Sequence, residues 1–223
     1  MIHLVLVDSE LELVPEPLWG HPAIVRRARL RKKKPNRLIL DSSFDHSAIR
    51  VKYPDEVDRR GRPDIVFHFL INALHSILNM EGHLRVYVHT RNDELIYVDP
   101  RTRIPKAYHR FIGLMEALFN NRVVPDKYNP LLRMVEGTVA DLVKEVGPTD
   151  VILLREGAER VNPYELPSSL GEEPMFLIGG FPHGDFLHEH PRDREISIYD
   201  KPLMAWTAAN EIIASYERKL IFK

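Results

Sequence analysis

The sequence predicts an α/β fold with a mainly parallel sheet. Strand-type and helix-type patterns alternate along its 223 residues, as in βαβ units. Three strand-type runs in the last third of the chain end in turn sequences: LLREG at 153–157, IGG at 178–180 and IYDKPL at 198–203. Taken alone, each of these sequences is typical of an ordinary turn at the end of a strand. Because ligands of open parallel sheets bind outside the carboxyl ends of strands, the three together favour one pocket.

The first 62 residues alternate short apolar runs with polar segments. We expect, in order, a strand at Ile2–Val7, a loop at 15–22, a basic helix at 23–34 that Pro35 ends, a strand at Arg37–Leu40, and a charged surface loop at 53–62.

The rest of the chain carries clearer helix starts and strand alternation. We expect a helix from Pro63 to about Met80, a hairpin of 84–89 and 95–98, a helix at 108–120, a helix at 138–146 that Thr138 caps with Asp141, strands at 150–154, 174–178 and 195–199, and a final helix at 203–220. With no internal repeat, we expect a single domain over residues 1–223, with insertions around 50–63 and 84–100.

Composition excludes several classes of protein. Hydrophobic residues make up 44% and charged residues 28%, which is typical of a folded globular chain. The absence of cysteine excludes disulfides, thiolate zinc sites and cysteine nucleophiles. No apolar run is long enough to span a membrane and the first residues do not resemble a signal peptide, so we expect a cytoplasmic protein without a membrane partner. Phosphate-loop, dinucleotide-binding and nucleophile-elbow motifs are missing.

Positive charge is concentrated in two places although the net charge is −1. Residues 26–37 hold eight cationic side chains, and residues 101–110 form a second group. Within the second group, Arg103, Lys106 and Arg110 would share one helix face if the segment were helical, and such a stripe suits contacts with a phosphate backbone. A solvated helix face is an equally good interpretation of the second group, whereas the density of charge in residues 26–37 slightly favours RNA binding over a solvated face.

Arg62-Pro63-Asp64 stands at a helix start. The carboxylate of Asp64 could hold the guanidinium of Arg62 in one orientation and leave donors free for a phosphate or a base. From local sequence alone, an acid at a helix terminus and a surface arginine are the favoured interpretation.

Histidines and an acid follow the IGG turn. Together His183, Asp185, His188 and His190 could bind a transition metal, which would suit a metal-dependent hydrolase. Histidines in a polar loop are more often solvated, so the sequence predicts no metal site.

Five segments together resemble one enzyme family. They are LILDSSFDHSAI at 38–49, Arg62-Pro63-Asp64, YVDPRTRIPKAYHRFIGLMEALF at 97–119, LIGGFPHG at 177–184 and ISIYDKPLMAW at 196–206. In this order they resemble the ribosome-biogenesis pseudouridine N1-methyltransferases, of the archaeal type, within the SPOUT class. The resemblance implies an α/β domain with a C-terminal trefoil knot, which no pattern argument would predict.

The resemblance also implies an activity and partners. The family transfers the methyl group of S-adenosylmethionine to the N1 position of a pseudouridine in small-subunit rRNA. It acts as a homodimer in small-subunit biogenesis, beside small-subunit ribosomal proteins. N1 methylation fits a chain without cysteine, since methylation of pyrimidine C5 usually needs a thiol nucleophile. An RNA-binding assembly factor with little turnover is the alternative.

Site residues follow from the matching motifs. The resemblance places the cofactor at Leu154, Gly179, Gly184, Ile198, Tyr199, Asp200, Lys201, Pro202 and Leu203, and treats Gly180 as secondary. It makes Arg62 a catalytic contact to RNA that Asp64 orients, and adds Arg103, Lys106 and Arg110 to the RNA surface. The proton acceptor is left open, with Asp64 as one candidate.

Overall fold

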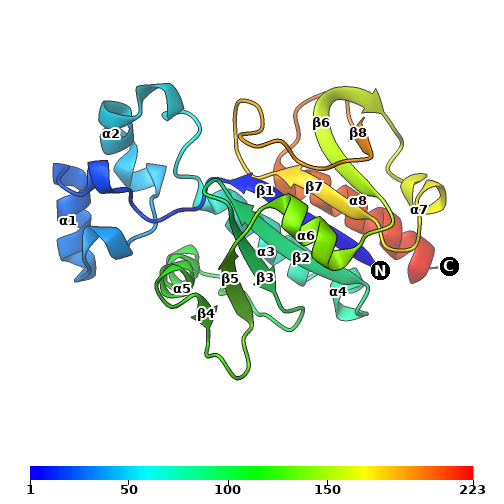
Figure 1. Ribbon diagram of the computed structural model, residues 1–223, viewed down its shortest axis with the longest axis horizontal. Coiled ribbons are helices and arrows are strands. Elements are labelled where there is room, and N and C mark those ends of the chain that lie inside the picture. The colour runs from blue at the N-terminus through cyan, green and yellow to red at the C-terminus, as the bar shows by residue number, and fades with distance from the viewer. Residues whose placement is uncertain (223) are drawn as a thin grey trace.

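The computed structural model describes residues 1–222 and contains one eight-stranded sheet (Figure 1). Its strand order is β4-β5-β3-β2-β1-β7-β6-β8. The strands are β1 Ile2–Ser9, β2 Leu84–Thr90, β3 Glu94–Val98, β4 Val123–Val124, β5 Leu132–Glu136, β6 Val151–Arg160, β7 Met175–Gly179 and β8 Arg194–Ser197.

Five neighbouring strands of the sheet run parallel. These are β2, β1, β7, β6 and β8, whereas β3, β5 and β4 continue the sheet in antiparallel pairs. All eight residues of β1 are buried, as expected for a central strand covered on both faces. The α/β class with a mainly parallel sheet is therefore confirmed, and the trefoil knot stays a prediction. Among the described residues, no helix is both long and apolar enough to cross a membrane.

Helices cover both faces of the sheet. Ile2, Leu4 and Leu6 of β1 face a core shared with α3 (Pro63–Leu74), α4 (Ile77–Met80), α5 (Tyr108–Asn121), α7 (Leu166–Ser169) and α8 (Ala205–Leu220). Val5 and Val7 face the opposite core, which α6 (Val139–Val146) covers. This alternation follows from the period of two in a strand.

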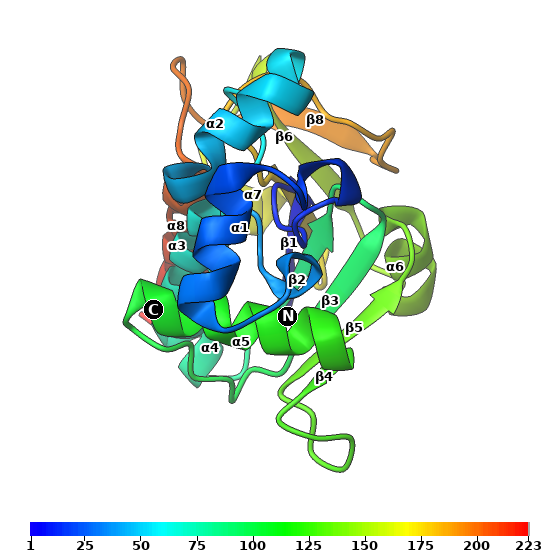
Figure 2. The ribbon, with the colours of Figure 1, turned by 90° about the vertical axis from the view of Figure 1, so that its left-hand side faces the viewer.

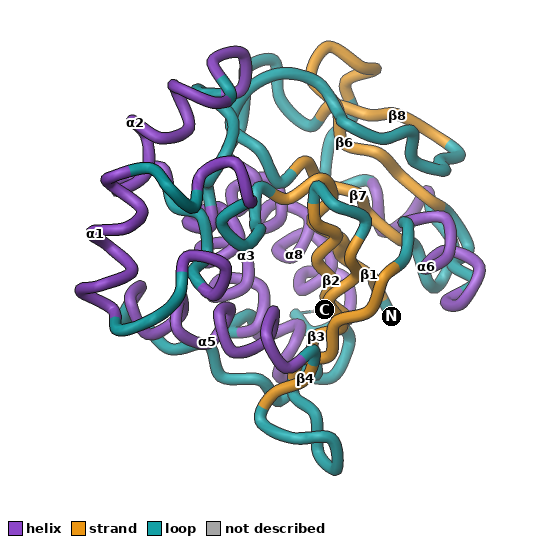
Figure 3. The backbone as a smooth tube through the Cα atoms, turned by 60° about the vertical axis from the view of Figure 1, so that its left-hand side comes forward, coloured by secondary structure: helices purple, strands orange, loops and turns teal. Residues whose placement is uncertain are grey.

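A separate helical lobe adjoins the carboxyl end of β1 (Figures 1 and 2). It consists of α1 (Pro22–Arg31), α2 (Ser42–Lys52) and three short 3₁₀ turns at Glu16–Leu18, Pro35–Arg37 and Pro54–Glu56. Its own small core is built from apolar residues of α1, α2 and the segments that join them. In Figure 3, α1 and α2 stand apart from the strands.

Two predictions for the segments of this lobe are wrong. Residues 37–40 form no strand: a 3₁₀ turn is followed by a buried segment that makes a single bridge between Leu13 and Ile39. Asp41 then caps α2, because its Oδ1 accepts a hydrogen bond of 2.9 Å from the Ser43 amide. Residues 53–62 are also not a simple surface loop, since Arg60 is buried.

Other elements also differ from the prediction. The helix that begins at Pro63 breaks after Leu74, where Ser76 caps the short α4. Strands β4 and β5 were not predicted. The hairpin at 84–100 is integral to the sheet, since β2 pairs in parallel with β1. The capping box between Thr138 and Asp141 is confirmed.

Candidate active site

A cavity of about 360 Å³ lies where the three turn sequences meet. It opens beyond the carboxyl ends of β7 and β8 and beside the break in register of β6. Most of the residues that were expected to bind the cofactor line this cavity: Leu154, Gly179, Gly184, Ile198, Tyr199, Lys201 and Leu203. Asp200 and Pro202 belong to the same turn but do not line the cavity. The fold thus brings together segments more than 40 positions apart in the sequence.

The cavity combines apolar walls with backbone donors. Ile178, Ile196 and Leu203, with two alanines of α8, form the apolar part. In residues 1–222, no backbone amide between positions 199 and 203 donates a hydrogen bond to another protein group. These unpaired donors beside apolar walls suit a ligand that has acceptor atoms and an apolar ring.

Glycine is required at two turn positions for different reasons. A Cβ at Gly179 would lie 3.0 Å from the ring of Phe181, at the cavity wall. A Cβ at Gly180 would lie 2.5 Å from Ser9 Oγ and 2.8 Å from Ser9 Cα. Gly180 also exchanges backbone hydrogen bonds with Val7 and Glu10. Gly180 therefore holds β7 against the end of β1, and Gly179 leaves room at the cavity.

Arg62 and Asp64 form the pair that their spacing predicts. Asp64 accepts from Arg62 Nε at 2.8 Å and from a terminal nitrogen at 2.7 Å, so both carboxylate oxygens are engaged. This bonding raises the pKa of Arg62 above its ordinary value. The other terminal nitrogen of Arg62 has no hydrogen-bond partner within the described chain. Both side chains are about one-third exposed.

Three helix N-termini meet around this pair. Arg62 precedes α3, Asp41 caps α2, and Tyr108 begins α5. The Tyr108 hydroxyl donates to Asp41 Oδ2 at 2.8 Å, and its ring packs edge-on against Phe67 of α3. Burial and the Asp41 carboxylate raise the pKa of Tyr108, so the hydroxyl keeps its proton. Positive ends of helices favour anions at this place.

The predicted basic stripe is only partly helical. Arg110 lies in the first turn of α5, but Arg103 and Lys106 lie before the helix begins, so the condition for one shared helix face is not met. All three side chains are exposed, and within residues 1–222 none of them forms an ion pair. Tyr108, which follows this segment, lies close to Arg62 and bonds Asp41.

The basic segment at 26–37 divides into two kinds of side chain. Arg27 pairs with the buried Asp45 at 2.6 Å, and Arg31 and Lys33 hold the buried Glu116 at 2.8 and 2.5 Å. These three cations therefore form ion pairs with buried carboxylates inside the protein. The remaining cations of the segment are exposed: Arg26, Arg29, Lys32, Lys34 and Arg37.

Arg59 forms a clamp between the lobe and the cavity that was not expected from the sequence. Arg59 pairs with buried Glu10 at 2.7 Å, its guanidinium lies 4.1 Å from the centre of the Phe181 ring, and it donates to the carbonyl of Asp185. Phe181 and Asp185 both line the cavity. Only a charged residue within the supposed surface loop hinted at it, since the partners lie far away in the sequence.

The four residues considered for a metal site do not come together. His183 is exposed, and Asp185 pairs with Arg155 on the cavity wall. His188 and His190 instead contact Asp8 at the end of β1.

Comparison with known proteins decides the family. The model described as EMG1/NEP1 methyltransferase matches residues 4–217. The chain belongs to the EMG1/NEP1 methyltransferase family. The resemblance inferred from the five segments is thereby confirmed.

Similar proteins cover the chain from end to end. It is 53% identical over 219 residues to "Ribosomal RNA small subunit methyltransferase Nep1" of Thermococcus onnurineus, covering 97% of this chain and 98% of the relative. It is 52% identical over 222 residues to the protein of the same name from Pyrococcus furiosus, covering 99% and 98%. Among solved structures, Archaeoglobus fulgidus Nep1 bound to S-adenosylhomocysteine matches with a TM-score of 0.83 and 35% identity, over 97% of each chain.

Proposed function

We propose that the chain transfers the methyl group of S-adenosylmethionine to the N1 position of a pseudouridine in small-subunit rRNA. One observation carries the proposal: the turn cavity offers apolar walls and free backbone donors in a chain that matches an S-adenosylhomocysteine-bound relative throughout. S-adenosylhomocysteine is the product that S-adenosylmethionine leaves after methyl transfer.

The residues of the cavity fit this cofactor. The amides of Tyr199, Lys201 and Leu203 can donate to its polar atoms, and the apolar walls suit its adenine ring. Gly179 and Gly184 keep Cβ atoms away from the bound molecule. The bound cofactor supplies an electrophilic methyl group on a sulfonium. The protein contributes orientation and exclusion of water.

Arg62 is the substrate contact in this proposal. Its free nitrogen and the three converging helix N-termini favour an RNA phosphate beside the target base. Asp64 positions Arg62, because both of its oxygens are already occupied. Arg103, Lys106 and Arg110 extend the surface along the RNA backbone. A target in a single-stranded loop is easier to unstack than one in a duplex.

Methyl transfer to matched RNAs tests the proposal. Purified protein with radiolabelled S-adenosylmethionine is given a small-subunit rRNA loop that carries pseudouridine or, as the control, uridine. Label on the pseudouridine RNA alone, in a nucleoside that co-migrates with N1-methylpseudouridine, is the expected result. Labelling of both RNAs would overturn the N1 assignment. Labelling of neither would overturn the activity.

RNA-binding assembly without turnover is the second candidate. The exposed cations at 26–37 and 103–110 favour it, since they suit RNA binding whatever the chemistry. If they contact phosphates, removing one cation should reduce the slope of log affinity against log salt by about 0.7 to 0.9. A filter-binding titration at several salt concentrations measures this slope.

The organisation of the protein in the cell completes the proposal. We place the chain in the cytoplasm, as a homodimer and a single functional domain over residues 1–223, because its substrate is ribosomal RNA and the family resemblance implies a dimer. Small-subunit ribosomal proteins are its further partners. Light scattering of the purified protein tests the dimer directly.

A further inference from the structure

We infer that Asp8, His89 and His188 bind a transition-metal ion of the Zn²⁺ type, which fastens the loop at 181–192 to the ends of β1 and β2. One donor atom from each of these three residues lies within 4.8 Å of the other two. This inference goes beyond the proposed function, because methyl transfer to a ring nitrogen needs no metal.

The fold brings the donors together from three places. Asp8 stands at the end of β1 with a left-handed backbone, at φ 51°. His89 lies near the end of the neighbouring strand β2. The loop after β7 returns over both strands, and its Leu187 and His188 amides donate to Asp8 Oδ2 at 2.7 and 3.3 Å. These two bonds fix Oδ2, whereas Oδ1 is in hydrogen-bond contact with His188 Nδ1 at 2.7 Å, a contact that an ion between the two atoms would replace.

Distances within the cluster match a tetrahedral site. Asp8 Oδ1 lies 2.7 Å from His188 Nδ1 and 3.6 Å from His89 Nδ1. Ligands about 2.05 Å from a tetrahedral zinc ion are separated by about 3.3 Å, so the two separations would have to change by roughly 0.6 and 0.3 Å. The Asp8 amide donates to His89 Nδ1 at 3.3 Å, a long hydrogen bond that ion binding would have to displace.

Asp93 contacts the Nε2 atoms of both histidines, on the side away from Asp8. Its Oδ1 lies 3.0 Å from His89 Nε2, and its Oδ2 lies 3.5 Å from His188 Nε2. A carboxylate on the far nitrogen fixes the tautomer of a metal-binding histidine and makes it a stronger ligand. Two imidazoles therefore lie between two carboxylates, each with Nδ1 towards Asp8 and Nε2 towards Asp93.

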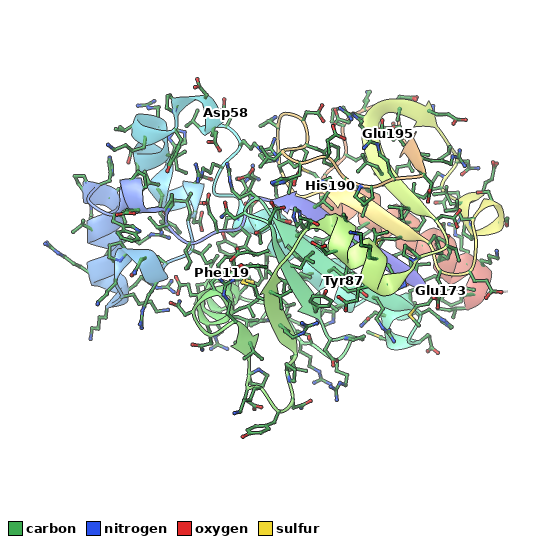
Figure 4. The ribbon with its side chains drawn as sticks, viewed as in Figure 1. Asp58, Tyr87, Phe119, Glu173, His190 and Glu195 are labelled. Carbon is green, nitrogen blue, oxygen red and sulfur yellow. The ribbon has the colours of Figure 1, made fainter. Side chains whose placement is uncertain are left out.

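His190 supplies an independent sign that a ligand belongs here. Its side chain is 2% exposed and its Nε2 is a buried polar atom without a hydrogen-bond partner, although it lies 3.2 Å from Asp8 Oδ2. Buried polar atoms are nearly always satisfied. This nitrogen lies beside Asp8 Oδ2 and outside the group of three donor atoms, so a water molecule would supply the fourth ligand of the ion. His190 is labelled in Figure 4, beside the strands that it faces.

The donor set also selects the kind of ion. Imidazole nitrogens with one carboxylate suit Zn²⁺ and related transition metals, whereas Mg²⁺ and Ca²⁺ prefer oxygen ligands. His188 is about one-third exposed and gives the ion a route from solvent. The same loop carries the cavity residues Phe181 and Gly184, so the ion would stabilise the shape of the cofactor cavity.

Zinc titration of chelator-treated protein tests the inference. With a competing chelator as indicator, we expect one Zn²⁺ per chain and a higher melting temperature with zinc than without. His188→Asn should weaken zinc binding at least about 100-fold, and Asp93→Asn about 10- to 100-fold. His183→Asn is the matched control, since this exposed histidine of the same loop should change nothing.

Each result decides for or against the site. No saturable binding to the unaltered protein overturns the inference, whatever the variants do. Equal affinity in the unaltered protein and His188→Asn overturns it as well, and a loss with His183→Asn points to adventitious surface binding. Cofactor binding in the metal-free protein is measured alongside, so failure of the metal site and failure of the methyltransferase proposal are separate outcomes.

Discussion

The turn cavity and the Arg62 cluster are built in opposite ways. The cavity owes its chemistry to main chain: glycines at its wall, free amides at 199–203 and apolar side chains. The Arg62 cluster consists of charged and polar side chains at three helix starts. Added atoms should therefore destroy the first site, whereas removed atoms should destroy the second.

Arg62→Ala should have the largest effect. Removal of the guanidinium takes away a charge-assisted donor at the substrate, and the rate kcat/KM of methyl transfer should fall roughly 100- to 1,000-fold. Affinity for S-adenosylmethionine, measured by calorimetry, should not change, because Arg62 does not line the cavity. Arg62→Lys keeps the charge without the two-point bond to Asp64, so its kcat/KM should lie between those of the unaltered protein and Arg62→Ala. A parallel loss of cofactor binding would contradict the separation of the sites.

Gly179→Val should act on the other region by adding atoms. The new Cβ would lie 3.0 Å from Phe181, and its methyl groups would enter the cavity. We expect calorimetry to show affinity for S-adenosylmethionine about 100-fold weaker, or about 2.7 kcal/mol, with RNA affinity unchanged. The control is Gly113→Ala, where a Cβ meets no atom within 4 Å. Unchanged cofactor affinity would contradict the placement of the cofactor at this turn.

Asp45 makes the stability of the helical lobe depend on pH. Burial raises the pKa of Asp45 from 3.8 to about 6, against the lowering effect of Arg27. The folded state therefore holds this proton more tightly than the unfolded state, so stability falls as pH rises from about 4 to about 6 and then levels off. The upper limit of this loss of stability is about 3 kcal/mol, at about 1.36 kcal/mol per pKa unit.

Asp45→Asn removes this titration. Urea denaturation at several pH values should show the variant gaining stability over the unaltered protein between pH 4 and 6. Parallel curves for the two proteins would show that Asp45 titrates normally.

Arg59→Ala should have the smallest effect, and it tests whether the two regions are independent. It severs the contacts to Phe181 and Asp185, while Arg91 still pairs with Glu10 at 2.6 Å. Cofactor affinity should weaken about tenfold, or about 1.4 kcal/mol. Arg101→Ala is the control of equal charge, because Arg101 pairs with Asp99 on the surface. No change in cofactor affinity would mean that the lobe does not support the cavity.

Local sequence was enough where a site depends on neighbouring residues. The capping box of Thr138 and Asp141 follows from their spacing of three, whereas the spacing of Arg62 and Asp64 allowed their contact and the family resemblance favoured it. The glycine turns could be located from their own sequence, although the contact that requires glycine at position 180 comes from the distant Ser9.

Long-range contacts left no local signal. The apolar run at 38–40 is as buried as a strand, and only its tertiary surroundings make it a loop. The cluster of Asp8, His89 and His188 joins residues up to 180 positions apart, so sequence grouped His188 with its near neighbours instead. The Arg59 clamp was missed for the same reason.

Strand β1 has a consequence for how the chain is made. Its two neighbours are β2, which ends at Thr90, and β7, which begins at Met175. During synthesis at about 5 to 20 residues per second, roughly 4 to 17 seconds separate the emergence of these two strands. Throughout that interval the apolar strand at the centre of the protein has an open edge that can pair with other nascent chains. Assembly therefore depends on protection of this edge before the last third of the polypeptide has left the ribosome.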